Sequence, residues 1–320
     1  FETGTKLATR RALNTCLDAT ADLIPGLLAG SADLTGNTGV KLATAVNQSA
    51  DDPGGSQVHY GIREHAMASM MTGMALHGGV LPVAGTFFIF SDYMRPAVRL
   101  AAMSEAHVVY SWTHDSVGLG QDGPTHQPVE HLATMRAMPN LRLIRPADAN
   151  ETAHAWRVAV DSDGPTGLAL SRQDLPVLAG TEGAYEGVRR GAYVLRTPDG
   201  APEVVLVGTG SEVQVCIAAA EQLAAGVGGP SVRAAVVSMP CWELFALQDQ
   251  SYRQGVLPPG VPKLAVEAGA SLGWERWVDD SVSLDHFGAS APGATVLEHF
   301  GFTADNVTAR ARALLVRQAG

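Results

Sequence analysis

Short apolar runs alternate with segments of helical periodicity along almost the whole chain. Strand-like runs are predicted at residues 80–84, 107–112, 142–144, 167–170, 203–207, 234–237 and 264–266. Helical patterns lie between or after them, at 64–76, 92–103, 149–160, 212–225 and 304–316. The repeated order of strand, helix and strand predicts βαβ units, and therefore mainly parallel sheets with helices on both faces. We expect an α/β, doubly wound fold.

The apolar pattern breaks once, near residues 179–190, where the sequence AGTEGAYEGVRR has no period. A second α/β pattern starts after this break, so we predict two domains, 1–183 and 184–320, which suits a chain of 320 residues. Ser211 and Gln214 form a capping-box signature in front of one helix of the second domain. The segment 35–56 is polar and unpatterned, which predicts a long loop, either close to a site or mobile.

Four methionines recur at helical spacing in the segment 64–76, at Met67, Met70, Met71 and Met74. Such a stripe could be taken for a cofactor-binding surface. A stripe at positions i, i+3, i+4 and i+7 is far more often core, and we predict that these side chains are buried.

Composition and charge exclude some classes of binding partner. The net charge is −10, from 22 basic and 32 acidic residues, with no basic block, so nucleic acid and anionic membranes are poor partners. The sequence has no apolar stretch of membrane-spanning length, and its start does not have the pattern of a signal peptide. Its cysteines, Cys16, Cys216 and Cys241, are far apart, which predicts free thiols in a reducing cytoplasm.

Candidate chemistry is densest in residues 114–128, HDSVGLGQDGPTHQP, which directly follow a predicted strand. Open α/β sheets bind ligands at the carboxyl ends of their strands. Glycines there let the backbone approach a ligand, and the imidazoles and carboxylates can transfer protons. The alternative is a surface turn whose histidines have no function, and the density of polar groups argues against it. A metal site is disfavoured because the chain has neither CxxC nor HExxH.

Two further clusters flank predicted helices. Residues 59–65, HYGIREH, place Glu64 at the start of the methionine-rich helix, where an acidic residue can simply complement the helix dipole. Residues 86–93, TFFIFSDY, space Phe87, Phe90 and Tyr93 three apart, which gives one aromatic face. By itself such a face is more often core than ligand pocket.

Together, the motifs carry a family resemblance. GIREHAM, TFFIFSDYMRPAVR, HDSVGLGQDGPTHQPVEHL, RPADANET and SRQ occur in the order and spacing seen in transketolases. Over essentially all 320 residues the chain resembles the pyrimidine-binding and C-terminal domains of that family, which use thiamine diphosphate. The resemblance implies a transketolase-like pyrimidine-binding domain at 1–183 and a transketolase C-terminal domain at 184–320. The implied reaction transfers a two-carbon ketol unit from a ketose, or ketose phosphate, to an aldehyde.

The resemblance assigns cofactor roles. Glu64 matches the catalytic glutamate that binds the N1′ atom of the aminopyrimidine ring and shares a proton with it. That contact favours the 4′-imino form, which removes the proton from the thiazolium C2. Phe87, Phe90 and Tyr93 match the aromatic pocket around the ring. Asp33 matches a family residue near the cofactor.

The resemblance also assigns substrate roles. Asp122 and His126 match residues that bind the sugar hydroxyls nearest the broken bond, and we count both as catalytic. Arg10, His114 and Arg172 match residues that hold the distal phosphate of the sugar. Guanidinium groups suit phosphate because they donate forked, charge-assisted hydrogen bonds.

Two departures from the family pattern change the expectation. The GDG motif and the later asparagine, which hold the diphosphate and its Mg or Ca ion in the family, are missing. We therefore expect no metal on this chain, and a partner that binds the diphosphate, either a separate N-terminal subunit or a further domain. The start of the chain suits separate subunits slightly better, assembled as a dimer of heterodimers. In addition, Asn37 or Thr38 replaces a phosphate-binding serine, so the acceptor aldehyde could be unphosphorylated.

Three alternatives stay open. The β subunit of a 2-oxo-acid dehydrogenase has a similar size and domain order, but the full HDSVGLGQDGPTHQP string and the sugar-binding His126 argue against it. Deoxyxylulose-phosphate synthase shares DGPTH and is less similar upstream. A non-catalytic assembly subunit would not need Glu64 or the aromatic residues.

Overall fold

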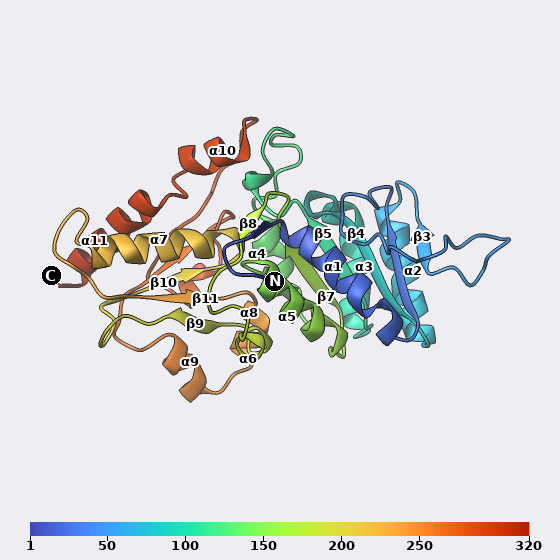
Figure 1. The fold of residues 1–320 in the computed structure, drawn as a ribbon, viewed down its shortest axis with the longest axis horizontal. Coiled ribbons are helices and arrows are strands. Elements are labelled where there is room, and N and C mark those ends of the chain that lie inside the picture. The colour runs from blue at the N-terminus through green and yellow to red at the C-terminus, as the bar shows by residue number, and fades with distance from the viewer. Residues whose placement is uncertain (320) are drawn as a thin grey trace.

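Six parallel strands from the first half of the chain form one sheet in the computed structural model, which describes residues 1–319 (Figure 1). In spatial order they are β3 (Gln57–His59), β2 (Leu27–Ser31), β4 (Leu81–Phe87), β5 (Val109–Thr113), β7 (Thr166–Leu170) and β6 (Arg142–Ile144). β2, β5 and β7 are buried at every position. Continuous burial is what parallel strands show when helices cover both faces of their sheet.

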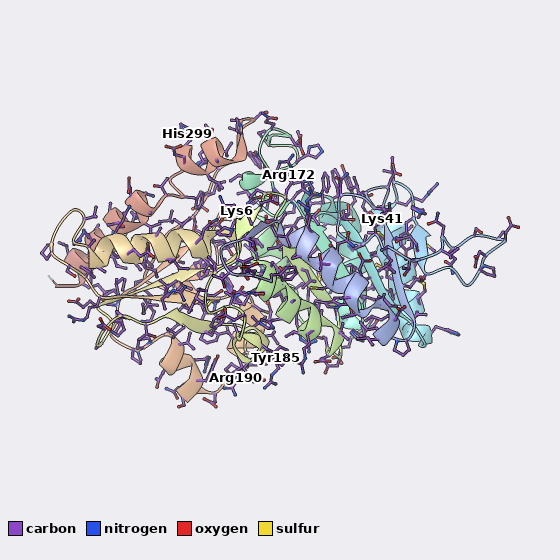
Figure 2. All side chains as sticks on the ribbon, viewed as in Figure 1. Lys6, Lys41, Arg172, Tyr185, Arg190 and His299 are labelled. Atoms are coloured by element: carbon purple, nitrogen blue, oxygen red, sulfur yellow. The ribbon has the colours of Figure 1, made fainter. Side chains whose placement is uncertain are left out.

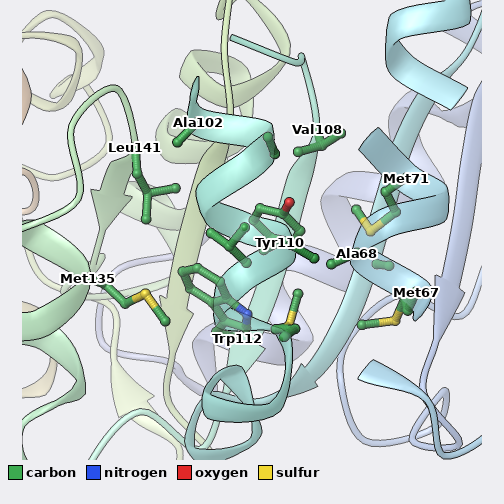
Figure 3. Packing of buried hydrophobic residues seen from close by; sticks show 14 of the residues in the cluster. Met67, Ala68, Met71, Ala102, Val108, Tyr110, Trp112, Met135 and Leu141 are labelled. Carbon is green, nitrogen blue, oxygen red and sulfur yellow. The ribbon is translucent and has the colours of Figure 1, made fainter. Parts of the chain in front are cut away.

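Helices cover both faces of this sheet. They are α1 (Thr9–Thr20), α2 (Glu64–His77), α3 (Ser91–Met103), α4 (His131–Arg136) and α5 (Ala149–Val160). α1 packs against α5 on one face, and α2 packs against α3 on the other. Figure 3 shows the core on this second face, which includes Tyr110 and Trp112 of β5. Their rings stack with 5.1 Å between the centroids. In the described part of the chain, no helix has the length and apolar character needed to cross a membrane.

The methionine stripe is only partly core. Met67 and Met71 are fully buried, and Met74 packs against the same cluster. Met70 is 52% exposed, so its predicted burial is wrong. The buried face of α2 is centred between Met71 and Ala68, and not on the methionine stripe. Successive residues of a helix are 100° apart around its axis, so Met70 lies outside this face and points toward solvent.

The second half of the chain forms a five-stranded sheet. Its spatial order is β13 (Asp280–Val282), β12 (Lys263–Val266), β10 (Val204–Gly208), β11 (Ala234–Ser238) and β9 (Tyr193–Arg196). Only the edge strand β9 is antiparallel, so the predicted doubly wound and mainly parallel architecture is confirmed. The main helices are α7 (Val213–Ala224) and α11 (Ala304–Ala319) on one face, and α8 (Trp242–Ala246) and α9 (Gln250–Val256) on the other.

Smaller elements complete the chain. They are β1 (Lys6–Leu7) and β8 (Leu175–Pro176), which pair antiparallel, α6 (Tyr185–Arg189) and α10 (Gly293–His299). The unpatterned segment 179–190 thus contains a short helix that the sequence did not predict. The segment 35–56 holds no helix or strand among its described residues, as expected for a long loop, apart from one bridge at Asn47.

The predicted capping box is wrong. α7 begins at Val213, after a turn of 3-10 helix (Gly210–Glu212), and no side chain caps it. The Ser211 hydroxyl donates to the carboxylate of Glu212 at 2.6 Å, and Glu212 itself pairs with Arg145. Arg145 belongs to the part of the chain that forms the six-stranded sheet, here called the first unit, and Glu212 to the part that forms the five-stranded sheet, the second unit. A tertiary ion pair therefore takes the groups that would otherwise cap the helix.

Glu151, in the first turn of α5, ties the first unit to the second sheet. Its side chain is fully buried. One carboxylate oxygen accepts hydrogen bonds from the hydroxyls of Tyr193 at 2.7 Å and Ser238 at 2.6 Å, and the other accepts the N–H of Ala147 at 2.7 Å. Burial, with the nearby carboxylate of Asp148, raises the pKa of Glu151 to about 7.

The raised pKa of Glu151 predicts a pH dependence of stability. The folded state holds this proton up to about pH 7, whereas the unfolded carboxyl loses it near its ordinary pKa of 4.5. The contribution of Glu151 to the free energy of unfolding is thus greatest below pH 4.5 and falls as the pH rises to 7, by on the order of 3 kcal/mol. We expect E151Q, which cannot titrate, to lack this fall in urea unfolding at pH 5 and pH 8. The exposed E221Q should follow the wild-type profile, and parallel profiles for wild type and E151Q would contradict the assignment.

Candidate active site

The predicted site residues gather at the carboxyl ends of the first sheet's strands. Glu64 is the first residue of α2, and only 8% of its surface is exposed. Its carboxylate has no hydrogen-bond partner among the described residues. It borders an open cavity of about 610 Å³, which is also lined by Ile62, Arg63, His65, Phe90 and Tyr93. A buried carboxylate that faces a cavity without a protein donor is available to a ligand.

The three aromatic residues form a row beside this cavity. Phe87 ends β4, Phe90 ends the short 3-10 helix that follows, and Tyr93 lies in the first turn of α3. The rings of Phe87 and Phe90 stack at 5.7 Å between centroids, and those of Phe90 and Tyr93 lie 5.9 Å apart. Tyr93 is 65% exposed, so the row ends at the molecular surface. The spacing of three in the sequence therefore does produce one continuous aromatic surface.

Two imidazoles contact the rings of Phe87 and Phe90 in this row. His114 directly follows β5 and stacks on Phe87 with 3.6 Å between ring centroids. Its φ of +61° is rare for a residue with a side chain, and such strain occurs mainly where a site needs it. His126 meets the ring of Phe90 edge-on at 5.5 Å. The structure thus brings together the clusters at residues 86–93 and 114–128, which are separate in the chain.

A threonine fixes each imidazole, and the sequence interpretation missed both. The Thr113 hydroxyl lies 2.9 Å from Nδ1 of His114, and the Thr125 hydroxyl lies 3.0 Å from Nδ1 of His126. Each contact leaves Nε2 free for a ligand. The signal was present in the sequence, because a threonine immediately precedes each histidine.

Cationic groups surround His114. Burial lowers the pKa of His114 to about 3, and Arg10, Arg172 and His126 lower it further by repulsion, so the imidazole is neutral. The pKa of Arg10 is also lowered, first by burial and then by Arg172. Figure 2 labels Arg172, which follows β7 where the two units meet. Two guanidinium groups near one neutral imidazole favour an anionic ligand. Arg10, and not the exposed Arg11, lies beside His114, and its predicted role in binding phosphate stays a prediction.

Asn37 and Thr38, in the loop after β2, differ in their position relative to this cationic region. Thr38 is fully buried, and its hydroxyl donates to the carbonyl of Leu34 at 3.0 Å. Its own carbonyl accepts from Ser111 at 2.6 Å, so Thr38 is committed to the fold. Asn37 is exposed, and its backbone carbonyl accepts a hydrogen bond from Arg10 at 2.8 Å. Asn37 is therefore the residue beside Arg10.

Asp122 and Asp33 stay at the edge of the site. Asp122 is exposed in a loop held by Gln127, whose amide donates to the carbonyls of Gly120 and, in the second unit, Ala289, both at 2.9 Å. Asp33 is exposed two residues beyond β2, with a φ of +64°. No contact among the described residues joins either carboxylate to Glu64 or the aromatic row. The predicted roles of Asp33 and Asp122 stay predictions.

One carboxylate of the 114–128 motif is structural. Asp115 is buried, and its Oδ2 accepts a hydrogen bond from Nε of Arg145 at 2.8 Å. It therefore holds the loop and does not face the cavity. Within residues 1–319, no three His, Cys, Asp or Glu side chains come together in a way that could hold a metal ion.

Comparisons with known proteins identify the family of this chain. Residues 5–177 match the family model described as transketolase, pyrimidine binding domain, and residues 191–303 match the transketolase-like TK C-terminal domain. The chain is 52% identical to a transketolase of Geobacillus stearothermophilus, over 98% of this chain and 48% of that protein. It is also similar to a crystal structure of Pichia stipitis transketolase in complex with sedoheptulose-7-phosphate, with a TM-score of 0.94 and 38% identity, over 99% of this chain and 47% of that one.

A third similar structure has nearly the same length as this chain. The chain matches a structure described as a split gene transketolase, inactive beta4 tetramer, with a TM-score of 0.79 over 97% of this chain and 99% of that one. At 23% identity this match shows a shared fold. In contrast, the chain spans about half the length of the curated relatives it matches.

Proposed function

The chain belongs to the transketolase family, and from this membership we propose that it provides the half of a transketolase active site that binds the aminopyrimidine ring of thiamine diphosphate. The proposed reaction transfers a two-carbon ketol unit from a ketose phosphate to an aldehyde. One observation carries the proposal: Phe90 lines the cavity beside Glu64, and the stacked rings of Phe90 and Phe87 continue from it to the neutral His114, which has Arg10 and Arg172 close by. A ring-binding surface and an anion-binding region thus lie side by side.

The residues around the cavity fit an aminopyrimidine. Glu64 supplies a carboxyl group without a partner in the described chain, and Phe90 and Tyr93 supply flat apolar surface against which a heterocycle can stack. Thiamine diphosphate, when bound, supplies a carbon nucleophile and an electron sink for breaking the bond next to a carbonyl. Glu64 would hold a proton at N1′ of the ring, and the aromatic row would exclude water from that contact and so strengthen it.

The remaining residues would bind the sugar. The neutral His114, with its Nδ1 engaged by Thr113, can present Nε2 to a hydroxyl or a carbonyl oxygen. His126 and Asp122 would contact the hydroxyls nearest the bond that breaks. Arg10 and Arg172 would hold the distal phosphate, where their mutual repulsion is relieved by the anion.

The proposal requires a partner that binds the diphosphate and its Mg or Ca ion. Large apolar side chains are exposed on or just before α2 and α3, the helices whose first turns hold Glu64 and Tyr93: Ile62, Met70, Leu76, Tyr93, Leu100 and Met103. Exposed apolar side chains that gather on neighbouring elements mark an interaction site. We therefore assign this face to the diphosphate-binding half, supplied by a second subunit or by a further domain, within a dimer of such pairs in the cytoplasm.

Reconstitution tests the proposed function. The chain, combined with its diphosphate-binding half, thiamine diphosphate and Mg²⁺, should transfer a ketol unit from xylulose 5-phosphate to an aldose phosphate. Decarboxylation of pyruvate instead would support a 2-oxo-acid dehydrogenase. No turnover with either donor, in an assembly that binds the cofactor, would support a non-catalytic role.

Arg172 should determine the preference for phosphorylated sugars. We expect R172A to raise KM for a phosphorylated donor about tenfold or more and to leave KM for its unphosphorylated analogue nearly unchanged, because only the phosphorylated donor loses a charge-assisted hydrogen bond. Steady-state kinetics with both donors measures the difference. The exposed neighbour Arg11 offers a matched control, since R11A should change neither constant. Equal effects of R172A on both donors would remove phosphate from the role of this residue.

A further inference from the structure

A second gathering of unpaired cations lies in the C-terminal unit, away from the site above. α9, the start of β12 and the turn of 3-10 helix at Trp274–Arg276 surround a cavity of about 220 Å³. Arg253, Lys263 and Arg276 line it, together with Phe245, Trp277 and two glutamines. Three of its few lining residues are thus cationic, in a chain whose net charge is −10.

No carboxylate balances these charges. None lines the cavity, and within residues 1–319 none of the three cations lies within ion-pair distance of an Asp or Glu. Asp279 accepts a hydrogen bond from the backbone N–H of Lys263 at 2.8 Å and not from its ammonium group. By comparison, Arg136, Arg142 and Arg145 of the first unit all have carboxylate partners. Like charges that converge without a counter-charge create a local positive potential.

The donors are held in place by the walls of the cavity. Arg276 lies over the ring of Trp277, with 4.7 Å between its guanidinium carbon and the ring centroid. The Lys263 ammonium donates to the carbonyl of Val261 at 2.7 Å, which leaves two of its protons free. Nε of Arg253 is buried and has no acceptor among the described residues. A guanidinium that lacks an acceptor costs folding free energy, which an anion can recover.

From these contacts we propose that this cavity binds a small phosphorylated anion. Two guanidinium groups and an ammonium match the charge and the oxygen geometry of a phosphate, and the glutamine amides can reach a short substituent attached to it. Lys263 begins β12, and Glu267, directly after the other end of this strand, pairs with Arg136 in the first half of the chain, so the cavity lies at the end of β12 that is away from this contact. The proposal does not depend on the proposed function.

The indole N–H of Trp277 gives a local readout. We expect inorganic phosphate, added to the complete ¹⁵N-labelled protein, to shift the Trp277 indole signal saturably in ¹H–¹⁵N spectra, with W277F used to assign that signal. R253Q/K263Q should weaken the response at least tenfold. R276Q, which changes an exposed side chain and leaves the fold intact, should weaken it several-fold. The same test therefore remains available if the double variant does not fold.

Controls separate this cavity from the active site. R172A removes a cation from the catalytic region, and R233Q removes an exposed cation of the same unit that lines neither site. Both variants should respond like wild type at Trp277. A Trp277 signal that does not move with phosphate, that moves equally with potassium chloride at the same ionic strength, or that still moves fully in R253Q/K263Q would overturn the proposal.

Discussion

Replacing Glu64 by glutamine is expected to lower kcat for ketol transfer by at least about a thousandfold in the complete enzyme, within the range of acid–base catalysis by a single group. Glu64 borders the proposed ring-binding cavity, and no described residue donates a hydrogen bond to its carboxylate. Glutamine keeps the size of the side chain and its place at the start of α2 but cannot exchange a proton with a bound ring. The loss should therefore fall on kcat rather than on stability.

Two measurements decide this prediction. Steady-state ketol transfer gives kcat, and urea unfolding of the variant should match that of wild type. E130Q is the matched control, because Glu130 is an exposed carboxylate of the same unit that does not line the cavity. We expect E130Q to retain wild-type kcat. Activity of E64Q within about threefold of wild type would remove Glu64 from the chemistry and, with it, the main support for the proposed cofactor site.

The sequence predicted β10 and β11 within one residue at each end, because both are central strands buried at every position and therefore form continuous apolar runs. β6, a three-residue edge strand, was also predicted to the residue. β13, Asp280–Val282, was missed, because two of its three residues are polar. The carboxylate of Asp280 binds Arg310 and Arg317 of α11, a tertiary contact that no local pattern reveals.

For the candidate site too, the sequence predicted some features and the structure was needed for others. Motifs identified the residue types and their order, and the structure adds which of them meet. The stacking of His114 on Phe87 joins two loops that end neighbouring strands, and only the sheet order puts those strands side by side. The opposite case is Asp115, which lies inside the densest motif and yet faces away from the cavity. Its partner Arg145 comes from another strand end, so sequence spacing could not separate a ligand-binding carboxylate from a structural one.

Arg145 is the centre of the contact between the two units. Its side chain is fully buried, and its guanidinium donates to Asp115 at 2.8 Å, to the carbonyl of Thr209 at 2.8 Å and to the carboxylate of Glu212. Burial by itself would lower the pKa of Arg145, but the carboxylates of Glu212 and Asp115 outweigh it and raise that pKa. Gly210 permits this approach, because a Cβ there would lie 2.6 Å from the guanidinium. One cation thus compensates two buried carboxylates, one from each unit.

Substitution of Arg145 by methionine should therefore lower the free energy of unfolding by about 3–5 kcal/mol, the cost of leaving buried charges without a partner. Methionine fills much of the same volume, so the loss would come from charge rather than from a cavity. R142M is the matched control, since Arg142 pairs with Asp163, whose side chain is 90% exposed, and such a pair contributes at most about 1 kcal/mol. Adding D115N and E212Q to R145M removes the uncompensated charges and should restore part of the loss. Urea unfolding measures all three variants, and a loss of less than about 1 kcal/mol for R145M would show that water, rather than Arg145, stabilises these carboxylates.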